Sequence, residues 1–382
     1  MNRIKVVEYT EAWTPGGIES YIINIMGLID KEKFDVVVWP AQIYADLFDE
    51  DIEKLGIKLY SPVQVEQYIN PLKRTINAIR IFRNTVRELN CDVMHLHAAN
   101  GVAWIYAYIA KKNGVKKLIF HAHASEMGEG KRFIKYSVHN VCKCLFWRNV
   151  DMRVACSEKA AEFLYTNNVL RHNDVKYINC IIDVDRFRFN SEVRKLWRKD
   201  NRVDDQEIIF LHIGRFQYQK NHHFLLEMFN EITSVIPSKL YLIGEGKAEQ
   251  EIRDHISSLG LDEKVIIVGK TREVEKYMWM SDVFLLPSNH EGNPIVTAEA
   301  QASGLTCYIS DRVTKRAKLL DSSKYIGIEN PKSSAGIIIN DYEKKSWSYD
   351  RVKSADVVLQ RGYDKYCQIQ ELQEMYSSEI SE

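Results

Sequence analysis

Short apolar runs alternate with longer amphipathic stretches along the chain, and residues 281–311 show this pattern most clearly. Residues 283–286 form an apolar run without polar interruption, which is typical of a strand buried on both faces of a sheet. A loop is expected over 287–291, a helix over 294–303 and a further strand from Thr306. This order predicts a strand-loop-helix-strand unit of a parallel sheet, whose loop lies at the edge where such folds bind ligands.

Three residues mark the ends of the helix expected at 294–303. Asn293 is a suitable N-cap, Pro294 suits the first helical position, and Gly304 suits the position just after the last turn. Backbone N–H groups at the start of a helix have no partner within it and attract anions. The sequence therefore predicts an anion-binding backbone after Gly292, where glycine lets a ligand approach closely.

The same alternation extends over both halves of the chain and predicts an α/β protein with parallel sheets. Strands are expected at residues 4–7, 35–39, 93–96, 118–123, 152–156, 208–213, 239–243, 265–268, 283–286 and 306–309. Further helices are expected at residues 21–29, 71–89, 248–259 and 362–376. The polar, highly charged segment 190–206 is interpreted as a hinge between two domains.

Length and composition indicate a two-domain globular protein. The chain has 382 residues, too many for one ordinary core, with 45% apolar and 27% charged residues. Its 52 basic and 52 acidic residues give no net charge, which argues against a nucleic-acid partner. A membrane-spanning run and a signal-peptide pattern are both missing, so a cytoplasmic protein is expected. The seven scattered cysteines are interpreted as reduced thiols.

Two carboxylates, Glu291 and Glu299, bracket the start of the predicted helix in a Glu-x7-Glu spacing. The block EGNPIVTAEAQASGLTCYISD, which contains both, resembles the donor-binding signature of family-4 retaining glycosyltransferases. The resemblance implies an α/β GT-B architecture, in which two Rossmann-like doubly wound domains face each other across a cleft. It also implies an acceptor-side domain over 1–187, a nucleotide-sugar-binding domain over 188–360, and a final helix in 361–382 packed back on the first domain.

The resemblance assigns contacts with the donor to six residues of this signature. Glu291 would hold hydroxyl groups of the donor sugar and Glu299 those of the ribose, because a carboxylate accepts two hydrogen bonds from a vicinal diol. The alternative is that Glu291 is an ordinary surface-loop residue and Glu299 a solvated helix residue. Around the diphosphate, the resemblance places the backbone of Gly292, Asn293, Pro294 and Ile295.

A pair of cations follows the strand expected at 208–213. Gly214-Arg215, with Lys220 a few residues later, resembles a Gly-Arg…Lys element of the same family. Cleaving a sugar from a diphosphate leaves negative charge on the departing nucleotide, and a guanidinium and an ammonium group stabilise that charge. Arg215 and Lys220 are therefore the predicted catalytic cations, and solvated loop residues are the alternative.

Two other segments resemble parts of the same donor site. Lys270 and Thr271 follow the strand expected at 265–268, where the family places the base of the nucleotide. Gly16 and Gly17 lie in a Gly-Gly-x-Glu loop after the first strand and resemble the element that borders the donor phosphates and the acceptor. A plain turn is the alternative interpretation of the two glycines.

Histidines end two neighbouring strands of the first domain. His95 and His97 lie in the segment DVMHLH, which resembles a strand of the family that ends in His-x-His, and His121 and His123 end the next strand. In the family, a histidine after this latter strand contacts the donor sugar. Either His121 or His123 is therefore expected in the catalytic site, and a structural role is the alternative.

Two basic stretches carry an apolar face. Residues 71–89 place cations among aliphatic side chains, and residues 131–148 mix cations with aromatic side chains. Helices of this kind lie on anionic membrane surfaces or pack in a core. Because lipid-linked acceptors are common in the resembled family, peripheral membrane contact is one of two interpretations.

The resulting hypothesis is a retaining glycosyltransferase of the hexosyltransferase type, in the cytoplasm or at the inner face of a membrane. It would move a sugar from a nucleotide-sugar donor, with a UDP-sugar favoured, to a glycan or glycolipid acceptor such as a lipid-linked or growing surface polysaccharide. The resemblance implies no metal and no cofactor, because Arg215 and Lys220 would supply the charge. A sugar-nucleotide 2-epimerase of the same fold and a non-catalytic partner subunit are the alternatives.

Overall fold

The computed structural model describes residues 3–13, 16–43, 48–60, 71–127, 132–347 and 350–378. The chain forms two compact units, of which the first comprises Met1–Ile181 and Lys365–Glu382 and the second Ile182–Asp364. The chain enters the second unit at residue 182 because Ile182, Val184 and Phe187 are buried in the core of that unit. The expected boundary at 187/188 lies inside this buried segment.

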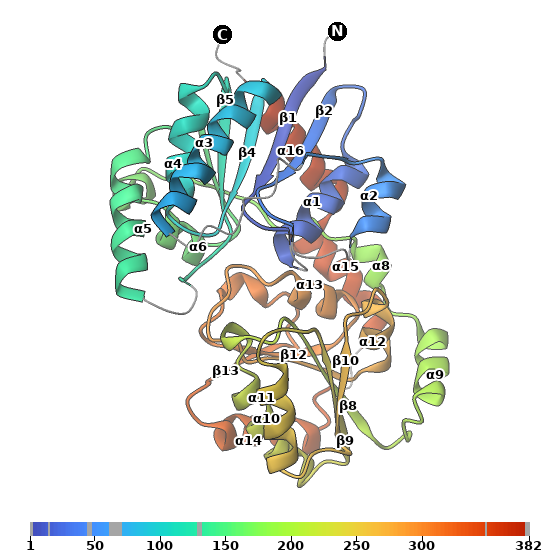
Figure 1. Ribbon diagram of the computed structural model, residues 1–382. Helices are drawn as coiled ribbons and strands as arrows, with labels where there is room; N and C mark the ends of the chain where they lie inside the picture. Colours follow the sequence, from blue (N-terminus) through green and yellow to red (C-terminus); the bar gives the residue numbers. More distant parts are fainter. Residues whose placement is uncertain are drawn as a thin grey trace. The chain divides into compact units, whose positions relative to one another are not determined.

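A parallel sheet of seven strands, in the order β3-β2-β1-β4-β5-β6-β7, forms the centre of the first unit (Figure 1). Its strands are β1 Ile4–Thr10, β2 Phe34–Pro40, β3 Lys58–Leu59, β4 Val93–Ala98, β5 Lys117–Ala122, β6 Met152–Ala155 and β7 Lys176–Tyr177. Its helices are α1 Gly17–Leu28, α2 Asp49–Leu55, α3 Pro71–Leu89, α4 Ala103–Lys112, α5 Arg132–Phe146, α6 Glu158–Leu164, α7 Asn167–Arg171 and α16 Lys365–Ser377. The strand order reverses between β1 and β4, and open sheets of this kind bind ligands at such a reversal.

The second unit contains a parallel sheet of six strands in the order β10-β9-β8-β11-β12-β13. Its strands are β8 Ile208–Ile213, β9 Ser238–Ile243, β10 Val265–Gly269, β11 Val283–Leu286, β12 Thr306–Ser310 and β13 Lys324–Ile326. Its α-helices are α8 Val184–Phe187, α9 Ser191–Asp200, α10 His222–Thr233, α11 Glu249–Ser258, α12 Val274–Met280, α13 Ile295–Ala302, α14 Pro331–Glu343 and α15 Ser354–Val358. Here the order reverses between β8 and β11, so the loops after these two strands meet at one edge.

Apolar side chains cover both faces of the second sheet, which explains its uninterrupted apolar runs. Successive residues of β8 enter two different cores, with Ile209 and Leu211 in one and Phe210 in the other. Helices therefore pack on both faces, as the sequence predicts for strands without polar interruption.

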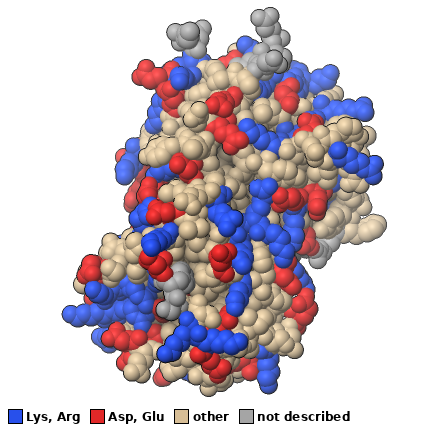
Figure 2. Space-filling model, turned by 180° about the vertical axis from the view of Figure 1, so that it is seen from behind, with Lys and Arg blue, Asp and Glu red and all other residues tan. Residues whose placement is uncertain are grey.

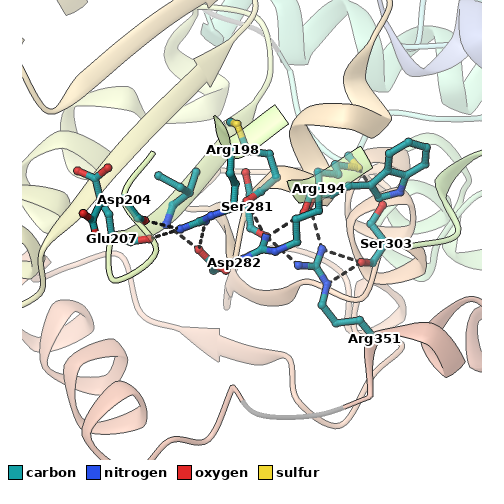
Figure 3. Close-up of polar contacts among 12 residues, drawn as sticks. Arg194, Arg198, Asp204, Glu207, Ser281, Asp282, Ser303 and Arg351 are labelled. Carbon is teal, nitrogen blue, oxygen red and sulfur yellow. Dashed lines mark hydrogen bonds and ion pairs between the residues drawn. The ribbon is translucent and has the colours of Figure 1, made fainter. Parts of the chain in front are cut away.

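The segment 190–206 is not a hinge, because most of it forms helix α9, which is fixed to the second unit. Asn190 caps this helix through its side-chain oxygen, which accepts hydrogen bonds from the backbone N–H groups of Glu192 and Val193 at 3.1 and 3.0 Å. Arg194 and Arg198 then project from α9 onto the start of β11 (Figure 3). This charged segment therefore fixes helix α9 to the rest of the second unit, since its guanidinium groups donate to backbone carbonyls of residues 279–281.

Three arginines converge on Ser281 and Asp282, directly before β11 (Figure 3). Arg194 donates to Asp282 at 2.5 Å and to the carbonyl oxygen of Ser281 at 2.7 Å. Arg198 reaches the other carboxylate oxygen of Asp282 at 3.3 Å, and Arg351 reaches the carbonyl of Ser281 at 2.9 Å. These contacts fix the strand that leads into the loop at 287–291.

The surface has no dominant sign of charge in the view of Figure 2, where basic and acidic side chains are interspersed. This mixture agrees with the equal numbers of basic and acidic residues, 52 of each. Within the part of the chain that the structure describes, no helix is long and apolar enough to cross a membrane.

Candidate active site

Lys220 and Glu291 come together from the loops that follow β8 and β11. The Nζ atom of Lys220 lies 2.7 Å from Oε1 of Glu291, and their side chains are 13% and 10% exposed. Lys220 reaches Glu291 by passing over Gly214, where a Cβ atom would lie 2.6 Å from Cε of the lysine. The spacing of glycine and lysine in the Gly-Arg…Lys element thus has a steric reason, since a side chain at 214 would displace Lys220.

Glu291 is held at both carboxylate oxygens and is only 8% exposed. Besides Lys220, Oε1 accepts a hydrogen bond from Ser288 Oγ at 3.0 Å, and Oε2 accepts one from Gln219 Nε2 at 3.1 Å. The interpretation of Glu291 as an ordinary solvated loop residue is therefore wrong. The sequence did not single out Ser288, which is an ordinary loop residue three positions before Glu291, or Gln219, which lies 72 residues before Glu291 along the chain.

Arg215 differs from Lys220 in that it is exposed and forms no ion pair with any residue that the structure describes. Lys270, in the loop after β10, is also exposed, but its Nζ lies 2.7 Å from Oε1 of Glu245. Thr271 Oγ1 accepts a hydrogen bond from the backbone N–H of Glu273 at 3.1 Å and so shapes the turn before α12. Arg215 is thus a cation of this edge with no carboxylate partner among the described residues, and it is free to bind an anion.

Helix α13 begins one residue later than the sequence predicts. Pro294, which is buried, is the N-cap, and Ile295 is the first helical residue. Asn293, expected as the N-cap, instead donates from its side-chain amide to the hydroxyl of Tyr363 at 3.2 Å. At the other end the prediction is confirmed, because Gly304 follows the helix with a φ of +71°.

Glu299 lies half-buried on α13, so it is not the solvated helix residue of the alternative interpretation. Burial raises the pKa of its carboxyl group to about 7, and Glu275 raises it further, while Arg186 opposes the shift. A carboxyl group with this pKa is partly protonated near neutral pH and can then donate as well as accept a hydrogen bond.

In the first unit, four histidines from β4 and β5 form one hydrogen-bonded cluster with Glu8 of β1. Nε2 of His95 lies 3.1 Å from Nδ1 of His121, and Nδ1 of His97 lies 2.9 Å from Nε2 of His123. His97 Nε2 lies 2.7 Å from Oε2 of Glu8. The sequence predicts His121 and His123 at a strand end, and the structure shows that they are two members of a larger polar group.

Of the two histidines expected in the catalytic site, His123 is the accessible one. His121 is fully buried and its Nε2 atom has no partner, whereas His123 is half-buried. Burial lowers the pKa of both imidazoles well below the usual range, and the neighbouring histidines lower it further. Both rings are therefore neutral at physiological pH.

Glu8 and Tyr376 are functional candidates that sequence reasoning missed. Both are fully buried, and the Tyr376 hydroxyl of α16 donates a short hydrogen bond to Oε1 of Glu8. Burial alone would raise the pKa of Glu8, but its interactions with His95 and His97 hold it well below the usual range. The one signal in the sequence was a carboxylate inside the apolar strand IKVVEYT.

Gly16 and Gly17 form the start of α1. Gly16 is the N-cap in an extended conformation with a φ of −164°, and Gly17 is the first helical residue. The backbone N–H of Ser20 donates to the carbonyl of Gly16 at 3.1 Å, which closes the first turn. The pair thus lies at the N-terminus of a helix at the carboxyl edge of the first sheet.

Among the residues that the structure describes, His95, His97 and His121 form the group with metal-ligand chemistry. Each offers a ring nitrogen, and these three atoms lie within 4.8 Å of one another. Ring nitrogens of these three histidines also take part in hydrogen bonds within the cluster and with Glu8. A metal ion and a network of shared protons are therefore two possible states of this cluster.

Two family models together match most of the chain. Residues 15–186 match the model described as Glycosyltransferase Family 4, and residues 193–345 match the model described as Glycosyl transferases group 1. The two matches correspond to the two compact units of the structure.

Individual proteins give the same result. The putative glycosyltransferase EpsF of Bacillus subtilis is 29% identical over 316 residues, 82% of this chain and 80% of that protein. An enzyme from Escherichia coli named UDP-Gal:alpha-D-GlcNAc-diphosphoundecaprenol alpha-1,3-galactosyltransferase is 22% identical, over 81% and 80% of the two chains. The crystal structure of Anabaena Alr3699/HepE in complex with UDP and glucose superimposes with a TM-score of 0.79 at 17% identity, over 99% of this chain and 100% of that one. The chain therefore belongs to the group 1 and family 4 glycosyltransferases and has their GT-B fold of two parallel-sheet α/β units.

Proposed function

We propose that this glycosyltransferase moves a hexose from a UDP-sugar to a hydroxyl acceptor with retention of the anomeric configuration. The observation that carries the proposal is the convergence of Lys220 on Glu291, with the exposed Arg215 on the same loop as the lysine. UDP is favoured because the Anabaena protein was solved with UDP and the Escherichia coli relative is named for UDP-Gal.

The second unit holds the groups for binding the nucleotide sugar. Glu291 accepts hydrogen bonds from hydroxyls of the sugar, and Glu299 does so from the ribose. The backbone from Gly292 to Ile295 leads into α13, whose first N–H groups favour a diphosphate. Lys270 and Thr271 border the base, and Gly16 and Gly17 of the first unit remain predicted donor contacts.

Transfer then depends on stabilising the departing diphosphate. As the acceptor oxygen bonds to the anomeric carbon, the bond from that carbon to the diphosphate oxygen breaks and its electron pair stays on the oxygen. Arg215 and Lys220 stabilise this negative charge, and the proton of the acceptor hydroxyl passes to the same oxygen, so charge and atoms balance. The two cations do the work of a metal ion, so transfer proceeds without one.

The acceptor, on this proposal, is a lipid-linked or growing surface glycan at the inner face of a membrane. Helix α5 supports this proposal, because Ile134, Val138, Val141 and Leu145 lie along one face of it and are 58%, 44%, 57% and 66% exposed. Helix α3 differs in that its Phe82, Val86 and Leu89 are buried in the core.

Exposed cations next to the apolar face of α5 also favour binding to an anionic membrane. Lys135 lies within the helix and Arg148 just beyond it, and both are exposed. An apolar stripe flanked by cations suits an anionic lipid surface. The name of the Escherichia coli relative specifies an acceptor carried on diphosphoundecaprenol, which is a membrane lipid.

Ligand binding and turnover test the proposed reaction. Purified protein is titrated with UDP, GDP, ADP and their sugar conjugates, and the melting temperature is followed, since a ligand of the native state raises it. UDP and one UDP-sugar should raise it, and turnover with a polyprenyl-diphosphate glycan should give a product of retained configuration by NMR. Conversion of the UDP-sugar without any acceptor would indicate the 2-epimerase. Failure of every nucleotide to bind would contradict the proposal.

Sedimentation with vesicles tests the membrane contact separately. Vesicles containing phosphatidylglycerol should carry the protein down, and the triple variant Ile134→Ser, Val138→Ser, Leu145→Ser should stay in solution. Leu196→Ser is the matched control, because this exposed leucine lies on α9 of the second unit. Equal sedimentation of the triple variant and the wild type would contradict the role of α5.

A further inference from the structure

Glu11 lies at the point where the strand order of the first sheet reverses. It directly follows β1, and Asn100 lies in the loop after β4, the strand that pairs with β1 on the other side of the reversal. The Nδ2 atom of Asn100 donates to Oε2 of Glu11 at 2.9 Å. Loops at such a reversal form the ligand-binding crevice of an open parallel sheet. The pair therefore lies where a ligand of the first unit is expected.

One of the two carboxylate oxygens of Glu11 is available to a ligand. Oε2 is occupied by Asn100, whereas Oε1 has no hydrogen-bond partner among the residues that the structure describes. The residue is half-buried, and burial raises the pKa of its carboxyl group to about 7, while the hydrogen bond from Asn100 opposes the shift. A polar group held on one side and open on the other is typical of a binding site.

The partner of Glu11 is fixed by its own loop. Oδ1 of Asn100 accepts a hydrogen bond from the backbone N–H of Val102 at 2.8 Å, so the amide cannot turn over and Nδ2 stays directed at Glu11. The next residue, Gly101, donates from its backbone to Nδ1 of His139 on α5 at 2.9 Å. A Cβ atom at Gly101 would lie 2.6 Å from the carbonyl oxygen of His139. This loop is therefore packed directly against α5.

Tyr106 of α4 supplies a hydrogen-bond donor close to Glu11. Burial raises the pKa of its hydroxyl group to about 12, and the charge of Glu11 raises it too, so the phenol keeps its proton. The half-buried ring is held by Tyr9 and Phe82, with centroids 5.8 and 4.6 Å away. An acceptor and a donor close to each other suit two hydroxyl groups of one sugar ring.

We propose that Glu11, oriented by Asn100 and accompanied by Tyr106, binds hydroxyl groups of the acceptor sugar, and that this sugar is neutral. An acidic sugar would bring a second carboxylate to Glu11, and like charges at such a site repel each other. The loop of Asn100 packs against α5, the helix with the proposed membrane face, so a lipid-linked glycan has this subsite close to its membrane. The inference rests on the proposed function, since it concerns the acceptor of that reaction.

Two acceptors that differ only at C6 of the last sugar test the subsite. Polyprenyl-diphosphate glycans ending in glucose or in glucuronic acid are compared with the UDP-sugar at pH 8, where Glu11 is mostly ionised. The wild type should prefer glucose. Glu11→Gln keeps an oxygen for Asn100 but presents an NH2 group at the free position. It should raise KM for the glucose acceptor roughly tenfold, weaken the preference for glucose, and leave KM for the UDP-sugar unchanged.

Glu32→Gln is the matched control, because this exposed glutamate precedes β2 and so lies at the opposite, amino edge of the same sheet. It should behave as the wild type does. The melting temperature shows whether each variant is folded. An unchanged KM for the glucose acceptor in folded Glu11→Gln, or a wild type that prefers glucuronic acid, overturns the inference.

Saturation-transfer NMR of the wild type with the same two glycans measures binding without turnover, so it does not depend on the proposed reaction or on the folding of a variant. With UDP present or absent, the glycan that ends in glucose should receive saturation and the one that ends in glucuronic acid should not. Equal saturation of both glycans, or of neither, overturns the inference. Binding of the neutral glycan without any transfer would contradict the proposed function and leave this subsite in place.

Discussion

The ammonium group of Lys220 and the carboxylate of Glu291 form an ion pair, with Nζ 2.7 Å from Oε1. Each is proposed to bind the donor, the lysine through the diphosphate and the glutamate through the sugar. The two side chains therefore neutralise each other before the donor arrives, and a ligand with both a phosphate and hydroxyls replaces their mutual contact. Their contributions to stability and to turnover can be separated by substitution.

Lys220→Met should lower both stability and turnover. Glu291 would lose its counter-charge while it remains largely buried, and the free energy of unfolding should fall by about 2 kcal/mol. Urea unfolding and steady-state turnover measure the two effects. In the double variant Lys220→Met, Glu291→Gln, stability should return toward that of the wild type while turnover stays low. Recovery of turnover in the double variant would contradict the catalytic role of Lys220.

Arg215→Ala should lower turnover about a hundredfold or more, as removal of one charge-stabilising donor does elsewhere. Stability should change by less than about 0.5 kcal/mol, because the side chain is exposed and has no ion pair to lose. Lys264→Ala is the control, since this exposed lysine lies on the same unit at the opposite end of β10. Equal turnover of Arg215→Ala and the control would remove Arg215 from the site.

Glu299 should make stability depend on pH in an unusual direction. The pKa of its carboxyl group is about 7 in the folded protein, against 4.5 for an ordinary glutamate, so the folded state binds more protons between these values. Its contribution is then fully present below about pH 4.5 and is lost as the pH rises through 7. Relative to Glu299→Gln, the wild type should lose about 3 kcal/mol of unfolding free energy from pH 4.5 to 8. A constant difference between the two proteins over this range would show that the carboxyl pKa is not raised.

Histidine protonation should act in the opposite direction in the first unit. His97 has a pKa of about 4 in the folded protein, below the 6.5 of a free imidazole, so the unfolded chain binds more protons between these values. Stability from this residue is present above pH 6.5 and is lost as the pH falls toward 4. Hydrogen exchange of the amides of β4 should therefore speed up from pH 6.5 to 4, after correction for intrinsic rates. Unchanged protection of β4 over this range would contradict the neutral state of His97.

Arg194→Met should destabilise the second unit by about 2–3 kcal/mol. It removes the partner of Asp282 and leaves the carbonyls of Trp279, Met280 and Ser281 without this donor. Lys195→Met is the control, since this neighbour is 73% exposed and, among the described residues, pairs with Glu192 at the surface. Urea unfolding compares the two variants. Equal stability would mean that α9 is not an anchor.

The sequence predicted those elements whose signal is local. Strands 208–213 and 283–286 and the helix 71–89 are confirmed at both ends, because buried apolar runs and a leading proline mark them. The prediction of Asn293 as the N-cap was wrong, since its side chain donates a hydrogen bond to the hydroxyl of Tyr363, 70 residues later. The prediction of a hinge at 190–206 was wrong for a similar reason. The atoms that accept hydrogen bonds from Arg194 and fix helix α9 lie 85–88 residues further along the chain.

For the candidate site, the positions of Lys220 and Glu291 after buried strands indicated the two residues that the structure brings together. The sequence did not indicate which other side chains hold them in place. Gly214, Lys220 and Glu291 stand out because their loops follow buried strands. The donors Ser288 and Gln219 and the carboxylate Glu8 are ordinary residue types in their own segments. The roles of Gln219 and Glu8 appear only when segments distant in sequence become neighbours, as with Glu8 and His95 in the register of β1 and β4.

The position of α16 determines the order in which the two units can be completed during synthesis. The second unit is one continuous segment, Ile182–Asp364, and can fold as soon as it has left the ribosome. The first unit buries Tyr376 of α16 beside Glu8, a residue that emerges 368 positions earlier. Until α16 arrives, the charged carboxylate lacks one of its hydrogen-bond donors, so strand β1 is complete only after a helix that is synthesised much later. A released chain that ends at residue 364 should therefore contain a folded second unit and a first unit that proteases still cleave.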